Sequence, residues 1–266
     1  MLPYIELFDK QIPLYGIFFY LGIALASICG IIICKRLGIE RYDVVYSAVY
    51  SMIGAMIGSK LLFIAVSWET IMELKLSLVS VLKGGFVFYG GLIGGGIGLI
   101  IYCAQFKLPF GKFGDLYVAA LPLGHAVGRI GCFFAGCCYG IPYDGPLAYT
   151  YHYTYGFTPL NVKLLPIQLI EAAVLMVIFA VGLAVYYRKN YRTYDQCLYY
   201  LCVYPLARFL LEYGRGDVER GSAGWFSTSQ WVSLCLIGLS VLLFVLRSRK
   251  TALSAVSSEK VVEITD

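Results

Sequence analysis

The sequence predicts an all-α integral membrane protein, built as a seven-transmembrane-helix bundle with a small extracytoplasmic cap between spans four and five. Of its 266 residues, 59% are hydrophobic and only 14% are charged, and the mean hydropathy is +0.75. Soluble domains are about 25% charged. Lipid offers the backbone no hydrogen-bonding partner, so each long apolar segment is expected to be a helix. We expect one transmembrane catalytic domain, residues 1–246, followed by a disordered cytoplasmic tail, residues 247–266.

Seven apolar segments are long enough to be considered as spans. Charged residues make the fourth and the sixth the least hydrophobic of them. The segments lie near residues 13–34, 44–67, 86–104, 115–135, 167–187, 196–213 and 230–246.

The charged loop residues predict the orientation of the chain. Most Lys and Arg residues fall in the loops after spans one, three and five and in the tail. Cytoplasmic loops carry an excess of these residues, so we expect the N-terminus outside and the C-terminus inside. The Tyr- and Pro-rich loop 139–165 is then the extracytoplasmic cap. The formal net charge of +5 is spread over short loops, which does not indicate nucleic-acid binding.

The first two spans carry polar residues whose role the sequence leaves open. Tyr15 is either an interfacial anchor or a hydroxyl that points into a cavity. Gly54 and Gly58 have the spacing that lets two helices approach closely. Lys60 beside them needs a partner or a route to water, and we interpret it together with the glycines as packing.

The start of the third span is rich in glycine. Gly90, Gly94 and Gly98 fall on one helix face, so a neighbouring backbone can come near. The pair Gly90-Gly91 also permits irregular backbone with exposed N–H groups, which a membrane tolerates only against protein or water. Tyr89 is either a donor into such a cavity or an interfacial aromatic residue.

The fourth span contains the strongest functional signal. An arginine at bilayer depth costs several kcal/mol, and intramembrane charge usually marks a functional site. Helical spacing places His125, Arg129, Cys132 and Gly136 on one face. The alternative is an arginine that pairs only for structural reasons.

The sixth span carries a second intramembrane arginine. Tyr204, Arg208, Glu212 and Arg215 follow one another at spacings of four, four and three, so they share a face. Arg208 and Glu212 can form an ion pair within the helix, and that pair alone would explain both residues. A buried carboxylate, Glu171 in span five, also needs a partner. Two arginines toward the same predicted side favour a shared site.

Two guanidinium groups suit an anion of the outer headgroup region. Arginine stays charged and offers a planar fork of donors that matches a phosphate. Tyrosines, glycine backbone N–H groups and Gln168 can complete the binding site. The chain has no HExxH, GxSxG or P-loop pattern, so metalloprotease, serine hydrolase and P-loop NTPase functions lack support.

Three cysteines near the end of the fourth span are possible metal ligands. No second Cys/His set of zinc spacing accompanies Cys132, Cys137 and Cys138. A disulfide of Cys137 or Cys138 is the other possibility. We expect neither a metal nor a cofactor.

In their order and spacing, these motifs resemble those of the prolipoprotein diacylglyceryl transferase family. The resemblance runs from Tyr15 to about Gly238. It is carried by Tyr15-Gly16, Phe88-Tyr89-Gly90-Gly91, Gly128-Arg129-Ile130-Gly131-x-Phe133, Pro166-x-Gln168-Leu169-x-Glu171, Tyr204-x3-Arg208-x3-Glu212-x2-Arg215 and Ser229-Gln230.

The resemblance implies an enzyme of lipoprotein biosynthesis in the bacterial inner membrane. Such an enzyme transfers a diacylglyceryl group from phosphatidylglycerol to the lipobox cysteine of a preprolipoprotein signal peptide and releases glycerol phosphate. Arg129 and Arg208 would then hold the phosphate, which stabilises developing charge. Glu212 would orient Arg208, and Arg215 would lie at the mouth of the binding site. The residues around the donor lipid would be Tyr15, Tyr204, Gly90, Gly91 and Gln168.

The chain departs from the family pattern at four positions. Tyr89 stands where a histidine is usual, Cys132 and Ala135 where asparagines are, and Cys137 where a glutamate is. Tyrosine has a pKa of about 10 and is a poor general base at neutral pH. His125, one turn before Arg129, is the candidate replacement, so Tyr89 and His125 both stand as catalytic candidates.

Two other functions fit the same donor site. A divergent relative would use the same phospholipid with a different acceptor, such as a glycan or a small thiol. A protein of the same fold could also bind lipid without catalysis, since fold does not determine function.

Overall fold

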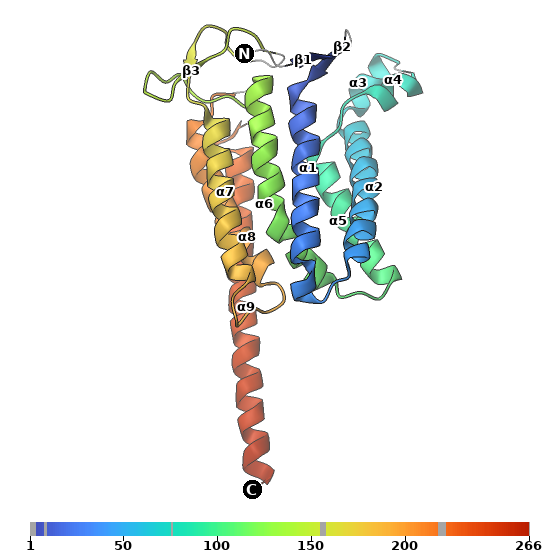
Figure 1. Ribbon diagram of the computed structural model, residues 1–266, viewed down its shortest axis with the longest axis vertical. Helices are drawn as coiled ribbons and strands as arrows, with labels where there is room; N and C mark the ends of the chain where they lie inside the picture. Colours follow the sequence, from blue (N-terminus) through green and yellow to red (C-terminus); the bar gives the residue numbers. More distant parts are fainter. Residues whose placement is uncertain (1–3, 8–9, 76, 155–157, 218–221, 266) are drawn as a thin grey trace. The chain divides into compact units, whose positions relative to one another are not determined.

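The structure is a computed structural model that describes residues 4–7, 10–75, 77–154, 158–217 and 222–265. It is mostly helical (Figure 1), as the composition predicts. The longer helices are α1 (Leu14–Ile33), α2 (Arg41–Val66), α5 (Phe88–Gln105), α6 (Phe110–Ala135), α7 (Ile167–Tyr186), α8 (Asp195–Leu211) and α9 (Thr228–Thr265). Short helices are η1 (Cys34–Leu37), α3 (Trp68–Glu73), α4 (Leu78–Lys83) and η2 (Glu212–Gly214).

Within the described part of the chain, the strands form three two-stranded antiparallel sheets. They pair β1 (Tyr4–Leu7) with β2 (Lys10–Pro13), β3 (Tyr149–Thr150) with β4 (Lys163–Leu164), and β5 (Ser222–Ala223) with β6 (Phe226–Ser227). The β3–β4 pair lies within the predicted cap, residues 139–165.

Among the residues that the structure describes, five helices are long and apolar enough to cross a membrane. These candidate spans are Leu14–Leu37, Arg41–Val66, Phe110–Ala135, Ile167–Tyr186 and Thr228–Arg249, and Tyr89–Gln105 is a shorter apolar helix. Helix α8 has 17 residues. The structure therefore agrees with an all-α membrane protein, while the count of seven spans stays a prediction.

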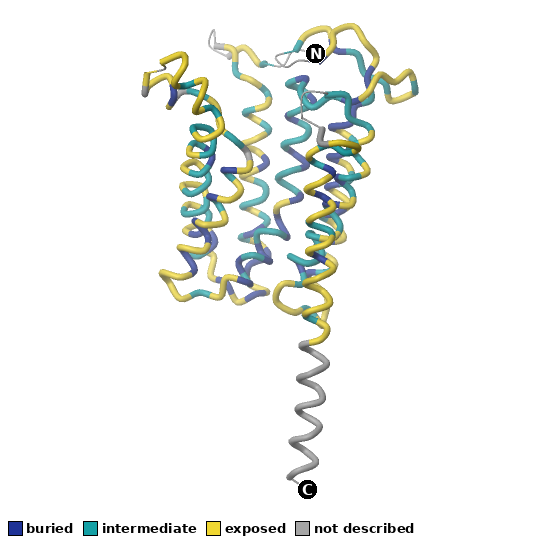
Figure 2. Tube along the Cα trace, turned by 180° about the vertical axis from the view of Figure 1, so that it is seen from behind, coloured by how far each residue is buried: buried dark blue, intermediate teal, exposed yellow. Residues whose placement is uncertain are grey.

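Apolar side chains are exposed along the helices, as lipid-facing surfaces require. Figure 2 shows exposed residues running along the described helices. Ile32 is 67% exposed, Val66 72% and Phe244 65%. Exposed apolar surface on this scale is rare in monomeric soluble proteins and typical of contact with a membrane.

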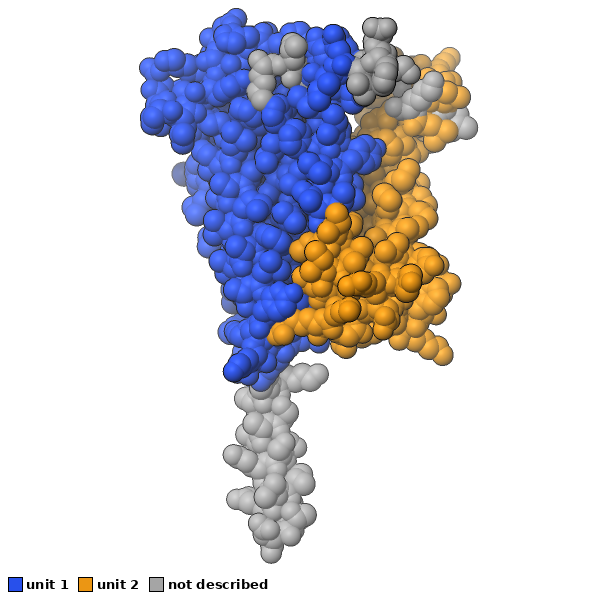
Figure 3. Space-filling view, viewed as in Figure 1, with its two compact units in different colours: residues 1–26, 118–266 blue, residues 27–117 orange. Residues whose placement is uncertain are grey.

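The chain divides into two compact units, which are coloured separately in Figure 3. Unit 1 comprises residues 1–26 and 118–266, and unit 2 comprises residues 27–117.

Unit 2 is built around close contact between α2 and α5. A Cβ atom at Gly54 or Gly58 would overlap backbone atoms of Gly94 or Gly90, so only glycine allows this approach. The packing role expected for these glycines is confirmed. Lys60 Nζ donates hydrogen bonds to the backbone oxygens of Val81, Gly84 and Gly85, at 3.3, 3.0 and 3.1 Å.

In unit 1, α8 packs against both α7 and α9. A small apolar core of Ala126, Ala172 and Leu175 joins α6 to α7, with Ile130 and Tyr204 packed against it. Helix α9 begins with a capping box: Gln230 N–H donates to Ser227 Oγ at 3.2 Å, and Gln230 Oε1 accepts from Ser227 N–H at 3.0 Å. The side chains of residues 250–266, most of the predicted tail, lie outside the described part.

Candidate functional site

A buried carboxylate on α7 joins three parts of unit 1. Glu171 is 1% exposed, and its Oε1 lies 3.0 Å from Nη2 of Arg129 and 4.0 Å from Nε2 of His125, both on α6. Its Oε2 lies 3.7 Å from Nη1 of Arg215, just beyond η2. A buried charge is tolerated only when it is paired. Glu171 is therefore the partner of Arg129 that the sequence left unidentified.

The second arginine forms the predicted intrahelical ion pair. Arg208 Nη2 lies 2.6 Å from Oε2 of Glu212, four residues on. Arg208 Nη2 also donates a hydrogen bond to Ser229 Oγ at 3.3 Å, which ties α8 to the first turn of α9. Glu212 opens η2, so the pair lies where α8 ends.

The two arginines share neighbours in unit 1. The rings of His125 and Tyr204 meet edge to face, with centroids 5.4 Å apart. Both side chains interact electrostatically with Arg129 and with Arg208. Both guanidinium groups therefore border one region, between α6 and α8.

Buried polar atoms in this region have no hydrogen-bond partner among the described residues. Among them are Nε of Arg129, Nη1 of Arg208 and Oε1 of Gln168, and the ion pairs of the two arginines run through Nη2 instead. Leaving a buried donor or acceptor unpaired costs about 1–3 kcal/mol, and more when the group is charged. Such atoms point to a polar ligand that both donates and accepts hydrogen bonds.

The formal charges around the site are balanced. The three arginines are matched by the carboxylates of Glu171, Glu212 and Asp217. An anion would therefore be bound by directed N–H groups rather than by a surplus of positive charge. The fork geometry of arginine provides such direction.

Arg215 is held in place at the edge of this cluster. Its Nε and Nη2 donate to the two carboxylate oxygens of Asp217 at 3.0 and 2.9 Å. Burial opposes charge on Arg215, but its interactions with Asp217 and Cys138 together raise the pKa of the guanidinium. An isolated antiparallel bridge between Gly140 and Arg215 joins the segment after α6 to the segment after η2.

The segment 139–165 covers the C-terminal end of α6. Tyr151 Oη donates to the Phe133 oxygen at 3.1 Å, and Thr154 Oγ1 donates to the Ala135 oxygen at 2.9 Å. These bonds satisfy carbonyls that a helix end leaves without partners. Phe133, Tyr151 and Leu164 form a buried apolar cluster beneath the segment. Its extracytoplasmic location stays a prediction.

Two predicted substrate-binding residues lie beside this helix end. Gln168 is buried, and its Nε2 donates to the Cys137 oxygen at 2.8 Å, which leaves Oε1 for a ligand. Tyr15, in the first turn of α1, is 43% exposed and stacks on Phe19. Tyr15 interacts electrostatically with Arg129, so it belongs to the same region of unit 1.

Tyr89, Gly90 and Gly91 lie in the first turn of α5, in unit 2. Both glycines are helical, and the Gly91 N–H bonds to the Val87 oxygen at 3.2 Å. Of the two possibilities that the glycines permit, the structure shows close packing: Gly90 lies against the backbone of Gly58. The first N–H groups of a helix still lack intrahelical partners, so a substrate-binding role for this turn stays a prediction.

Three residues of the cluster were not proposed as site residues from the sequence. Glu171 was recognised only as a carboxylate without a partner. Asp217 follows Arg215 by two residues, a spacing that signals no fixed geometry outside regular structure. Ser229 contributes through the fold, since it meets Arg208 only when α9 packs on α8.

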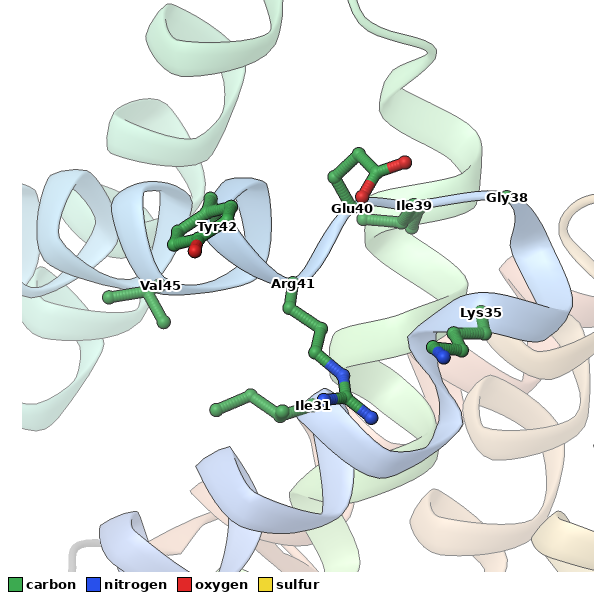
Figure 4. Close-up of a pocket in the computed structure, with 8 residues that line it drawn as sticks. All are labelled: Ile31, Lys35, Gly38, Ile39, Glu40, Arg41, Tyr42 and Val45. Carbon is green, nitrogen blue, oxygen red and sulfur yellow. The ribbon is translucent and has the colours of Figure 1, made fainter.

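A groove with a volume of about 710 Å³ lies elsewhere, within unit 2 (Figure 4). It is formed by α1, η1 and the start of α2, and Lys35 and Arg41 are the cations among its lining residues. That lining includes none of the predicted site residues, so the candidate site rests on the buried cluster of unit 1.

Comparison with known proteins gives a family for nearly the whole chain. A family model described as "Prolipoprotein diacylglyceryl transferase" matches residues 4–246. A phosphatidylglycerol–prolipoprotein diacylglyceryl transferase of Clostridium tetani is 35% identical over 90% of this chain and 94% of its own length. Similar enzymes of Clostridium perfringens and Dehalococcoides mccartyi are 32% and 33% identical, over 92% and 89% of this chain and 94% and 89% of their own lengths.

Proposed function

The chain belongs to the prolipoprotein diacylglyceryl transferase family, and we propose that it transfers a diacylglyceryl group from phosphatidylglycerol to the lipobox cysteine thiol of a preprolipoprotein. Glycerol phosphate is the other product. The observation that carries the assignment of roles is that Arg129 and Arg208 each have a buried N–H group without a hydrogen-bond partner among the described residues.

The phosphate of the donor lipid binds between Arg129 and Arg208. Nε of Arg129 and Nη1 of Arg208 donate to phosphate oxygens, and Glu171 and Glu212 hold the two guanidinium groups in position. Gln168 Oε1 accepts from a glycerol hydroxyl of the headgroup. Tyr15 and Tyr204 position the donor, and Arg215 stands at the entrance.

Catalysis comes mainly from stabilising charge on the leaving group. The acceptor sulfur attacks the glyceryl carbon, and the C–O bond to the phosphate breaks with its electron pair on oxygen. The leaving phosphate gains negative charge, so N–H donors fixed before the reaction lower the barrier. Removing one such donor costs about 2.7–4 kcal/mol in well-studied sites.

The acceptor must react as a thiolate, because the thiol form is a weak nucleophile. His125 lies beside Glu171 and Tyr204, where it can take the thiol proton. Tyr89, in the first turn of α5, stands where the family has a histidine and would act as a hydrogen-bond donor rather than as a base.

The chain spans the bacterial inner membrane seven times, with α5 and α8 as the two shorter spans. The N-terminus lies outside, segment 139–165 covers the site on the extracytoplasmic side, and the C-terminal end of α9 lies in the cytoplasm. The distribution of Lys and Arg in the loops supports this orientation.

Purified enzyme in lipid nanodiscs tests the function directly. With labelled phosphatidylglycerol and a lipobox peptide, we expect a thioether-linked diacylglyceryl peptide and one glycerol phosphate per peptide modified. A peptide with serine in place of the lipobox cysteine is the control. Glycerol phosphate released equally with the serine peptide would contradict transfer to the thiol.

A further inference from the structure

Three thiols gather at the C-terminal end of α6, within unit 1. The Sγ atoms of Cys132, Cys137 and Cys138 all lie within 4.8 Å of one another, and none of the three forms a disulfide in the described structure. Each residue is partly buried.

The way in which α6 ends explains why the side chains of Cys132 and Cys137 lie close together. The Gly136 N–H bonds to the Phe133 oxygen at 3.2 Å, and the Cys137 N–H bonds to the Cys132 oxygen at 3.1 Å. These two bonds, with Gly136 at a φ of 66°, form the Schellman motif. That motif brings together the side chains of the residues that occupy the Cys132 and Cys137 positions.

The backbone then turns again to add the third thiol. Cys138 has a φ of 58°, a conformation that is uncommon for a residue other than glycine. Such a conformation persists only where the surrounding structure holds it, and it often accompanies a functional site. Here Gln168, which bonds the Cys137 oxygen, and the Gly140–Arg215 bridge hold the turn on both sides.

The arrangement fits the ligand geometry of a thiophilic cation. Zinc–sulfur bonds of about 2.3 Å in a tetrahedron place sulfur atoms about 3.8 Å apart. Three sulfur atoms already within 4.8 Å of one another reach this spacing by small side-chain rotations. The thiols also lie near two cations, because Arg129 and Arg215 both interact electrostatically with Cys138.

We propose that Cys132, Cys137 and Cys138 bind one Zn²⁺ ion and that its fourth coordination position takes the acceptor thiol. Binding replaces the three S–H protons, which pass to water. Zinc sites with three protein ligands keep such an open position for water or substrate. The sequence alone predicts no metal, because no second Cys/His set is present; the fold supplies three ligands from a single helix end.

The second part of the proposal rests on the proposed function. A thiol bound to zinc gives up its proton more readily, His125 takes that proton, and this provides the nucleophile that the reaction needs. Its sulfur then forms the bond to the glyceryl carbon as the C–O bond breaks toward the phosphate. Zinc would thus favour the thiolate form of the acceptor, while His125 remains the base.

Metal binding is measured first, without reference to activity. The full chain is reduced and stripped of metal in nanodiscs without oxygen, then titrated with Zn²⁺, or with Cd²⁺ to observe cadmium–thiolate absorption. We expect one ion per chain and at least a tenfold loss of affinity in Cys137→Ser and in Cys132→Ser. Cys235→Ser, an exposed cysteine of α9, is the matched control and should bind as the wild type does.

Three outcomes would overturn the proposed zinc site. One is a wild-type chain that binds no stoichiometric Zn²⁺, and another is a Cys137→Ser variant that binds Zn²⁺ as tightly as the wild type does. The third is a mass of the purified chain lower by two hydrogens, which would show a disulfide in place of the metal site. The two-serine variant Cys132→Ser with Cys137→Ser keeps only Cys138 of the three clustered thiols and should give no stoichiometric cadmium–thiolate signal. A wild-type signal from that variant, shown to be folded by thermal unfolding, would also overturn the site.

Activity then tests the open position separately. We expect the metal-free enzyme to retain phosphatidylglycerol binding but to lose at least tenfold in transfer rate, with recovery on adding one equivalent of Zn²⁺. Full transfer by metal-free enzyme would overturn the role in acceptor activation while the binding titration still stands. Stoichiometric zinc without any transfer to the lipobox peptide would instead count against the proposed function.

Discussion

Replacing Arg129 by lysine tests the phosphate-binding site most directly. Lysine preserves the charge opposite Glu171, which lies 3.0 Å from the guanidinium, but an ammonium group cannot provide the planar fork. The change removes the Nε donor, which has no partner among the described residues and which we assign to the phosphate. The fold should persist, because the buried carboxylate still faces a cation.

The expected loss follows from the lost donor. Removing one fixed donor from a site of developing negative charge costs about 2.7–4 kcal/mol. At about 1.36 kcal/mol per factor of ten, this predicts a fall in transfer rate of roughly 100- to 1000-fold. Lysine keeps the positive charge and therefore part of its attraction to the phosphate, so we expect a loss near the lower end of this range.

Transfer from labelled phosphatidylglycerol to a lipobox peptide, in nanodiscs, measures the effect. Thermal unfolding in the same preparation checks that Arg129→Lys is folded. Arg188→Lys is the matched control, because Arg188 is an exposed partner of Asp195 and should keep its rate. Wild-type turnover in Arg129→Lys would refute a role for the guanidinium fork in holding the phosphate.

Three further predictions concern other residues of the chain. Glu171→Gln leaves Arg129 and Arg215 without their shared carboxylate, so we expect the free energy of unfolding to fall by about 3–5 kcal/mol. The measurement is the midpoint of thermal unfolding, which should be lower in the variant. An unchanged midpoint would mean that the ion pairs are not formed. Gly94→Ala places a methyl group against the backbone of Gly54, so the free energy of unfolding measured by denaturant titration should fall by about 1–3 kcal/mol. The control Gly96→Ala has nothing within 4 Å of its added Cβ and should not destabilise the chain. Equal effects of the two substitutions would argue against close contact between α2 and α5. Tyr89→Phe removes one hydroxyl donor, worth about 0.5–1.5 kcal/mol, so the transfer rate should fall roughly two- to tenfold; the same rate in both proteins would assign Tyr89 to packing.

Local patterns were enough to predict the helices and the pairs within them. The seven apolar segments each contain a helix, because lipid-facing backbone has no alternative to internal hydrogen bonds. Arg208 and Glu212 are four residues apart on one helix face, so their contact depends on little else. The Gly54 and Gly58 spacing likewise predicts close helix contact directly.

Contacts that depend on two separate elements were not predictable in the same way. Glu171 meets Arg129 and Arg215 only after α6, α7 and the segment following η2 have packed together. The grouping of Cys132 with Cys137 depends on how α6 ends, which Gly136 signals only weakly. At Gly90 and Gly91 the sequence permitted both irregular backbone and tight packing, and packing against α2 decided between them.

The sharing of one carboxylate by Arg129 and Arg215 has a consequence for mutational epistasis. Both Arg129 and Arg215 pair with Glu171, so when one arginine is substituted, the other has the whole negative charge of that carboxylate to itself. The penalties of substituting the two arginines should therefore not sum in the double variant, as is general for residues of one network. Sequence drift at either position is then constrained by what occupies the other, even though the two are 86 residues apart in the chain.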